Sequence, residues 1–123
     1  MNTETILKKV NDQIYQFEIA GDKKTFKLLN YFRGSIYGIR ICFEIMKLHF
    51  EKNSHECTKE YLTKKISPLA SRATVINFIN GEIDKGSLVT KVSNKDKRVK
   101  IIDPSKELID EFVSWLDSDN RAA

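Results

Sequence analysis

The most highly charged stretch of the chain is KVSNKDKRVK, residues 91–100. It holds five Lys or Arg side chains and a single acid, Asp96. The net charge of the stretch, five minus one, therefore equals the formal net charge of the whole 123-residue chain, +4. Ammonium and guanidinium groups at this density attract phosphates and carboxylates. The stretch is therefore either an ordinary solvated loop or part of a surface that binds an anionic partner.

Charge is distributed unevenly along the chain. Residues 1–58 hold nine basic and seven acidic side chains, residues 59–100 hold ten and four, and residues 101–123 hold two and six. A basic middle segment beside an acidic tail indicates a localised anion-binding face, not a generally cationic protein.

A second polar group, SRATVIN, lies at residues 71–77. On an exposed helix start, Arg72 suits guanine or phosphate, Asn77 suits adenine or phosphate, and the two hydroxyl side chains suit phosphate oxygens. The helix N-terminus adds partial positive charge. The residues expected to contact nucleic acid are Lys59, Lys64, Lys65, Ser71, Arg72, Ala73, Thr74, Asn77, Lys91, Lys95, Lys97, Arg98 and Lys100.

Motifs for catalysis are absent from the sequence. It contains no Gly-rich phosphate loop, no nucleophile elbow and no paired-histidine metal motif, so we expect neither an enzyme nor a cofactor nor a metal site. Two cysteines are too few for a disulfide framework. Cys42 lies among apolar residues, where a thiol usually acts as a small buried hydrophobe.

Apolar periodicity predicts the elements that must position these side chains, and the first is a helix. Ile6, Val10, Ile14 and Phe17 are spaced by four, four and three, which places them on one helical face. Either Thr3 or Thr5 is expected to cap this helix. The pair Gly21-Asp22, at residues 21–22, is expected to end it.

The next segment alternates spacings of three and four over seven apolar residues. They are Leu29, Phe32, Ile36, Ile39, Phe43, Met46 and Phe50. The pattern predicts a helix over about 25–52, with a kink or break at Gly34-Ser35. Core packing explains the stripe most simply, and a dimer seam is the alternative. The spacing of Gly34 and Gly38 indicates close helix packing.

A short helix capped by Thr58 is predicted next, then a turn and another helix. The second helix begins either at Ser67-Pro68 or at Ser71 and ends at Lys85-Gly86.

After residue 86 the apolar period changes to two, which predicts a hairpin formed by SLVTKV and KRVKII. The basic stretch is its tip, with Val92 and Val99 expected to pin the two strands and Asp96 to orient Arg98 or close the turn. A last helix is expected to start at Asp103-Pro104-Ser105. Its predicted apolar stripe is Ile109, Phe112, Val113 and Leu116, with Leu108 and Trp115 alongside.

The order of short helix, turn, helix and hairpin is the plan of a winged helix-turn-helix, a mainly α fold with one small β-hairpin. Such a domain places its second helix in the DNA major groove and its hairpin, the wing, along the backbone or in the minor groove. We expect one domain over residues 1–123. It would comprise N-terminal helices (1–54), the helix-turn-helix with its wing (55–103) and a C-terminal helix (104–123).

The segments SRATVINFI, DKGSLV and NKDKRVKII together resemble the core of MarR-type winged-helix transcription regulators. That family has a Ser-x-x-Thr-Val helix start, a Lys/Arg-Gly-Leu stop and an Asp-x-Arg wing. The matching residues are Ser71, Thr74, Val75, Lys85, Gly86, Leu88, Asp96 and Arg98. The turn SPLAS is about two residues longer than is usual in the family, and Ser87 is an extra residue before Leu88.

The resemblance implies a homodimer on a pseudo-palindromic operator, formed through the N- and C-terminal helices, and in many members regulation by a small molecule. The residues expected at the dimer interface are Ile6, Val10, Ile14, Phe17, Ile109, Phe112, Trp115 and Leu116.

Two functions are compatible with the sequence. The first is a sequence-specific regulator that binds double-stranded DNA, and the second is a winged-helix module whose basic face binds an acidic protein. Charged residues interrupt the most apolar stretch, and the N-terminus lacks the plan of a signal peptide. We therefore expect a cytoplasmic protein without a membrane span.

Overall fold

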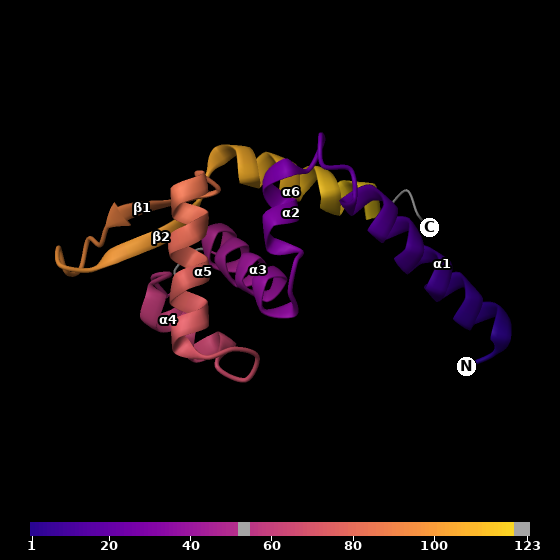
Figure 1. Cartoon of the computed structure of the whole chain (residues 1–123), viewed down its shortest axis with the longest axis horizontal. Coiled ribbons are helices and arrows are strands. Elements are labelled where there is room, and N and C mark those ends of the chain that lie inside the picture. The colour runs from indigo at the N-terminus through magenta and orange to yellow at the C-terminus, as the bar shows by residue number, and fades with distance from the viewer. Residues whose placement is uncertain (52–54, 120–123) are drawn as a thin grey trace.

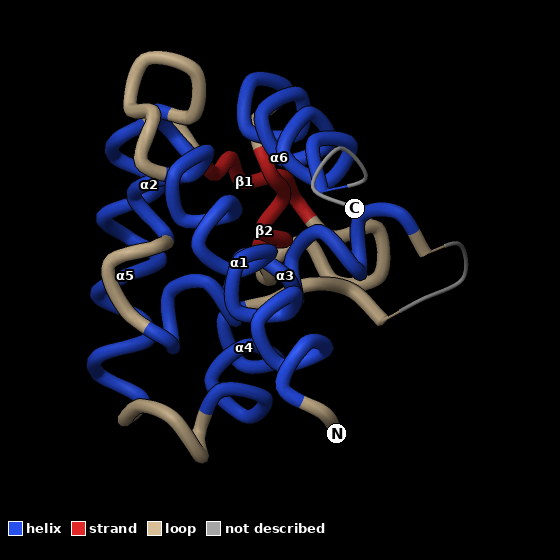
Figure 2. The backbone as a smooth tube through the Cα atoms, turned by 90° about the vertical axis from the view of Figure 1, so that its right-hand side faces the viewer, coloured by secondary structure: helices blue, strands red, loops and turns tan. Residues whose placement is uncertain are grey.

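The computed structural model describes residues 1–51 and 55–119, and in these residues six helices and one antiparallel hairpin follow one another. Their bounds are α1 (Thr3–Ala20), α2 (Lys27–Phe32), α3 (Ile36–Phe50), α4 (Lys59–Ile66), α5 (Arg72–Lys85), β1 (Leu88–Val92), β2 (Lys100–Pro104) and α6 (Lys106–Asp119). The hairpin and α1 lie at opposite ends of the long axis (Figure 1). Viewed along that axis, the strands lie between α6 and α3 (Figure 2).

The helix α1 projects from the rest of the chain and contacts it mainly through α6 (Figure 1). Asn2 caps it by accepting a hydrogen bond from the Thr5 amide at 2.8 Å, so the prediction of Thr3 or Thr5 as the cap was wrong. Both residues lie inside the first turn, and asparagine is a better cap than threonine. The helix ends at Gly21, as predicted.

The predicted break in the long helical segment is confirmed, because α2 and α3 are separate helices joined at residues 33–35. Ser35 caps α3 by accepting a hydrogen bond from the Gly38 amide at 3.0 Å. The break lets α3 present a different face to the core from the one that the spacing suggests. Core packing is confirmed for Leu29, Phe32 and Met46 but is wrong for the exposed Ile36, Phe43 and Phe50. The buried face of α3 instead carries Ile41, Cys42, Ile45 and Leu48.

A carboxylate from α6 caps the helix α2, which lacks a side-chain cap of its own. Glu111 Oε1 accepts hydrogen bonds from the amides of Leu28 at 2.9 Å and Leu29 at 3.0 Å. A negative charge at a helix N-terminus also interacts favourably with the helix dipole. This contact fixes α6 across the start of α2.

Local signals define the helix-turn-helix. Thr58 accepts a hydrogen bond from the Tyr61 amide at 3.0 Å, which confirms it as the cap of α4. Of the two predicted starts for α5, the structure has Ser71, whose hydroxyl accepts from the Thr74 amide at 3.2 Å. The predicted end at Gly86 is confirmed, with φ +86°, a left-handed conformation that glycine adopts without strain.

The hairpin is anchored differently from the prediction. β1 pairs with β2 so that Val92 faces Lys100, and Val99 lies before the second strand. Val92 is 56% exposed and does not pin the strands, whereas the carbonyl of the half-buried Val99 accepts a hydrogen bond across the hairpin from the Ser93 amide at 2.9 Å. The anchor is the buried Ser93, whose hydroxyl donates to the Glu56 carboxylate, 2.8 Å from Oε1, and accepts from the amides of Lys95 and Asp96.

The last helix starts later than predicted, because Pro104 ends β2 and Ser105 accepts a hydrogen bond from the Leu108 amide at 3.1 Å. Its buried residues are Leu108 and Phe112. Val113 and Leu116 are exposed, so the predicted stripe was wrong for these two.

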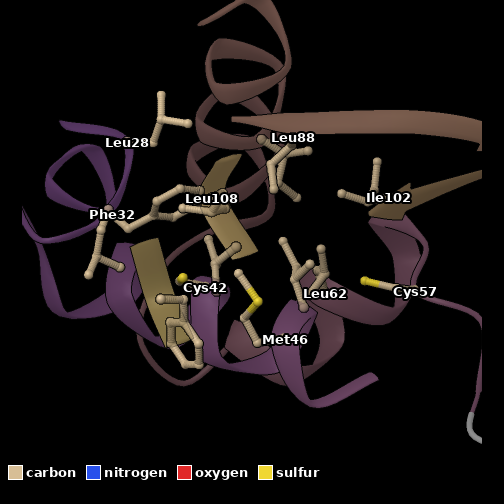
Figure 3. Close-up of a cluster of buried hydrophobic side chains, with 14 of the residues drawn as sticks. Leu28, Phe32, Cys42, Met46, Cys57, Leu62, Leu88, Ile102 and Leu108 are labelled. Atoms are coloured by element: carbon tan, nitrogen blue, oxygen red, sulfur yellow. The ribbon is translucent and has the colours of Figure 1, made fainter. Parts of the chain in front are cut away.

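The core gathers apolar side chains from α2 to α6 and from the base of the hairpin. Residues far apart in sequence, such as Leu28, Cys42, Leu62, Ile102 and Leu108, meet there (Figure 3). The prediction that Cys42 is a buried thiol is confirmed, and Cys57 is buried too. None of the described helices has the length and apolar content that a membrane span requires.

Both thiols should be unreactive in the folded protein. Desolvation raises the pKa of Cys42 and of Cys57 to about 12, so at pH 8 almost no thiolate forms. We expect a colorimetric thiol reagent such as 5,5′-dithiobis(2-nitrobenzoic acid) to react with both cysteines promptly in guanidinium chloride and only on the timescale of unfolding without it. Prompt reaction of either thiol under native conditions would contradict this burial.

Candidate nucleic-acid interface

The start of α5 is exposed and polar. Ser71, Arg72, Ala73 and Asn77 reach solvent there, and α5 packs across α4 in the helix-turn-helix (Figure 1). Thr74 is half-buried, and its hydroxyl accepts a hydrogen bond from Ser71 Oγ at 2.9 Å. Ser71 and Thr74 therefore serve the cap first, which leaves Arg72 and, one turn later, Asn77 as the exposed side chains that can contact a partner.

The wing carries the basic stretch, and each of its cationic side chains is exposed. They are Lys91, Lys95, Lys97, Arg98 and Lys100. Asp96 Oδ1 accepts hydrogen bonds from the Arg98 amide at 3.0 Å and from its Nε at 3.2 Å, which confirms that this acid orients the arginine and closes the turn. The Arg98 hydrogen bonds lower the pKa of Asp96. Because the Arg98 side chain is 91% exposed, its guanidinium stays accessible to a partner.

A shallow groove of about 280 Å³ joins the wing to the start of α4. Thr58, Lys59 and Glu60 line one side, and Thr90, Arg98, Val99, Lys100 and Ile102 line the other. The groove thus brings three predicted contact residues, Lys59, Arg98 and Lys100, onto one surface. This arrangement suits a phosphate backbone, which needs several cations in a row.

The other predicted lysines lie outside this groove. Lys64 and Lys65 are exposed in the last turn of α4, and Lys65 Nζ lies 5.6 Å from the centre of the Tyr61 ring. Lys91 Nζ lies 3.7 Å from Asp103 Oδ2. The other carboxylate oxygen of Asp103, Oδ1, lies 3.0 Å from His49 Nδ1. Part of the Lys91 charge is therefore already balanced within the protein.

Sequence reasoning missed Glu60, which pairs with Arg72 across the helix-turn-helix. Arg72 Nη1 donates to Glu60 Oε2 at 2.9 Å, and Nη2 donates to Oε1. The hydrogen bonds from Arg72 lower the pKa of Glu60, and the same bonds raise the pKa of Arg72. No spacing rule connects residues 60 and 72, and an acid in the first turn of a helix is ordinary. Among the described residues, no group of three or more His, Cys, Asp or Glu is placed to hold a metal ion.

Comparison with known proteins bears on the fold. No family model matches the sequence, and no curated protein matches it. Among solved structures, the chain is similar to the transcription regulator MarR from Oenococcus oeni PSU-1, with a TM-score of 0.50 and 20% sequence identity. The match covers 85% of this chain and 78% of that one. At this identity the likeness concerns architecture, and it confirms that the chain has a MarR-like winged-helix fold.

Proposed function

We propose that this chain is a transcriptional regulator that binds double-stranded DNA, with α5 in the major groove and the wing along the backbone or in the minor groove. One observation carries the proposal: the exposed start of α5 is linked through Glu60 to a groove that the wing cations line. The similarity in fold to a transcription regulator supports the same function.

The proposed contacts divide into two kinds. An α-helix fits the major groove, where Arg72 would read guanine and Asn77 would read adenine. Lys95, Lys97 and Lys100 make no ion pair with an acid in the part of the chain that the structure describes, so their charges remain for phosphates. Phosphate contacts fix the position of the protein, and base contacts fix the sequence that it prefers.

We further propose a homodimer. The exposed apolar residues of α1 are Ile6, Leu7, Val10, Ile14 and Phe17, with exposures of 45–68%. Helices in proteins gain most of their stability by packing an apolar face, so such a face needs a partner. A second copy fits because Leu116 and Val113 on α6 extend the apolar surface toward the same end of the molecule. Of the other residues predicted at the interface, Ile109 and Trp115 are half-buried and Phe112 lies in the core.

We also propose that a small-molecule effector binds between α1 and α6. A pocket of about 230 Å³ there is lined by Gln13, Gln16, Phe17, Arg33, Trp115 and Leu116. Arg33 Nη1 and Trp115 Nε1 are buried without a hydrogen-bond partner among the described residues. Two buried donors without acceptors favour a ligand that supplies acceptor oxygens.

Selection from a random duplex library tests the regulator. We expect enriched sites with two-fold symmetry and half-sites about one helical turn apart. If about six phosphates are neutralised, the plot of log K against log salt concentration should have a slope of about −5. Arg98→Glu should weaken binding to all sequences, whereas Arg72→Ala should also reduce discrimination among them. If the purified protein binds no duplex at low salt, the regulator is excluded and the basic face is left to an acidic protein partner.

A further inference from the structure

An acidic side chain lies within the basic surface proposed to meet DNA. Glu60 lines the groove that also contains Lys59, Arg98 and Lys100, and 60% of its side chain is exposed. A carboxylate in this place repels an approaching phosphate backbone and so weakens binding to every sequence. Its exposed ion pair and its place in the first turn of α4 each contribute only modestly to stability, so the carboxylate acts mainly on what approaches this surface.

The geometry of the pair shows which part of Arg72 remains available. Glu60 occupies the end of the guanidinium, where it accepts one hydrogen bond from Nη1 and one from Nη2. Of the five N–H groups of an arginine, three then remain. Two of them, on Nε and on Nη2, form the side edge and point in parallel. In the described part of the chain, no protein acceptor bonds to this edge.

Two parallel donors match the O6 and N7 acceptors of guanine in the major groove. A free arginine side chain would reach this arrangement only after losing much of its rotational freedom. Because Glu60 holds the guanidinium from behind, the open edge is oriented before DNA arrives. Residue 72 begins α5, the end of a recognition helix that contacts bases.

We propose that Glu60 is a positioning residue that contributes to specificity at this interface. It positions Arg72 for guanine, and its charge lowers the attraction of the pair for phosphates in general. The inference rests on the proposed DNA-binding function and assigns Glu60 a role within it. Discrimination between DNA sequences then has two sources at one position. Arg72 makes a bidentate contact with guanine, and the Glu60 charge repels the phosphates of DNA in which that contact is missing.

Three variants test this inference against the duplex selected by the wild-type protein. In Glu60→Gln, affinity for random-sequence duplex should rise about threefold, and preference for guanine at the base pair that depends on Arg72 should fall about threefold or more. Arg72→Lys keeps the charge but lacks the parallel donors, so it should lose that preference by about fivefold or more. Asp84→Asn, the matched control, makes the same charge change in the last turn of α5 and should leave the preference unaltered.

The outcomes separate this inference from the function on which it rests. A merely structural Glu60 would lower affinity for all duplexes when substituted, so a gain in random-sequence affinity together with lost preference supports the positioning role. If the wild-type protein selects a site and Glu60→Gln keeps its full preference, or lowers all affinities equally, the inference is wrong and the regulator stands. The inference also fails alone if the selected site has no guanine that depends on Arg72. If the wild-type protein selects no duplex, both fail together.

Discussion

Gly38→Ala should lower the free energy of unfolding by about 1–3 kcal/mol, although alanine is the better helix former. A Cβ atom at Gly38 would lie 2.6 Å from the carbonyl oxygen of Phe32 and 2.9 Å from Ser35 Oγ. The Phe32 oxygen belongs to the backbone and cannot move alone, so α3 must shift away from the end of α2. Because Ser35 caps α3, the shift also weakens that cap.

Gly81→Ala is the matched control, since Gly81 also lies inside a helix, α5, and a Cβ there meets no heavy atom within 4 Å apart from the nearby backbone of its own helix and its chain neighbours. This variant should be more stable than the wild type by about 0.5–1 kcal/mol, through the better helix propensity of alanine. Urea unfolding should therefore shift the two midpoints in opposite directions without changing the slope. If both substitutions stabilise the protein, the close approach of α3 to the end of α2 does not exist in solution.

The parts of the fold that sequence predicts well depend on residues that are neighbours in the chain. Thr58, Ser71 and Gly86 each bond to groups three or four residues away, so the residue type and its spacing carry the signal. The same holds for Asp96 and Arg98 in the wing turn. Because the winged-helix plan is read mainly from such caps, stops and turns, its element order is predictable without any tertiary contact.

Contacts between distant segments leave no comparable pattern. Glu111 caps α2 across 83 residues, and Ser93 meets Glu56 across 37. Nothing in the local sequence of either acid distinguishes it from an ordinary surface carboxylate. The pairing of Glu60 with Arg72 is of the same kind, and for that reason the interface could be predicted as a set of cations but not as a set of oriented ones.

The apolar stripe from Leu29 to Phe50 shows a further limit. The break at Gly34-Ser35 is predictable from two poor helix formers. How far α3 turns about its axis after the break depends on packing against α4 and β2, and the turn exposes Phe43 and Phe50. Periodicity predicts which face of a single helix is buried, but it does not predict which face of the next helix is buried after a break.

Ile14→Glu should convert the proposed dimer into a monomer. Ile14 is 48% exposed in the single chain and lies in the apolar face of α1, so a carboxylate there would be buried without a partner in the dimer. Glutamate is a good helix former, so α1 itself should persist. Light scattering behind size exclusion should show the change in mass. Affinity for a two-fold symmetric duplex should fall about 10²–10⁴-fold, because the second half-site no longer binds within the same complex.

The control Thr5→Glu adds the same charge to the same helix, but at 100° per residue position 5 lies on the side of α1 away from the apolar face. It should leave both mass and affinity unchanged. Binding to a duplex with one half-site separates a lost dimer from an unfolded protein, because a folded monomer keeps its affinity for that duplex. If Ile14→Glu remains dimeric, the two copies do not meet through α1, and the apolar surface around Phe43 and Phe50 on α3 becomes the better candidate for the seam.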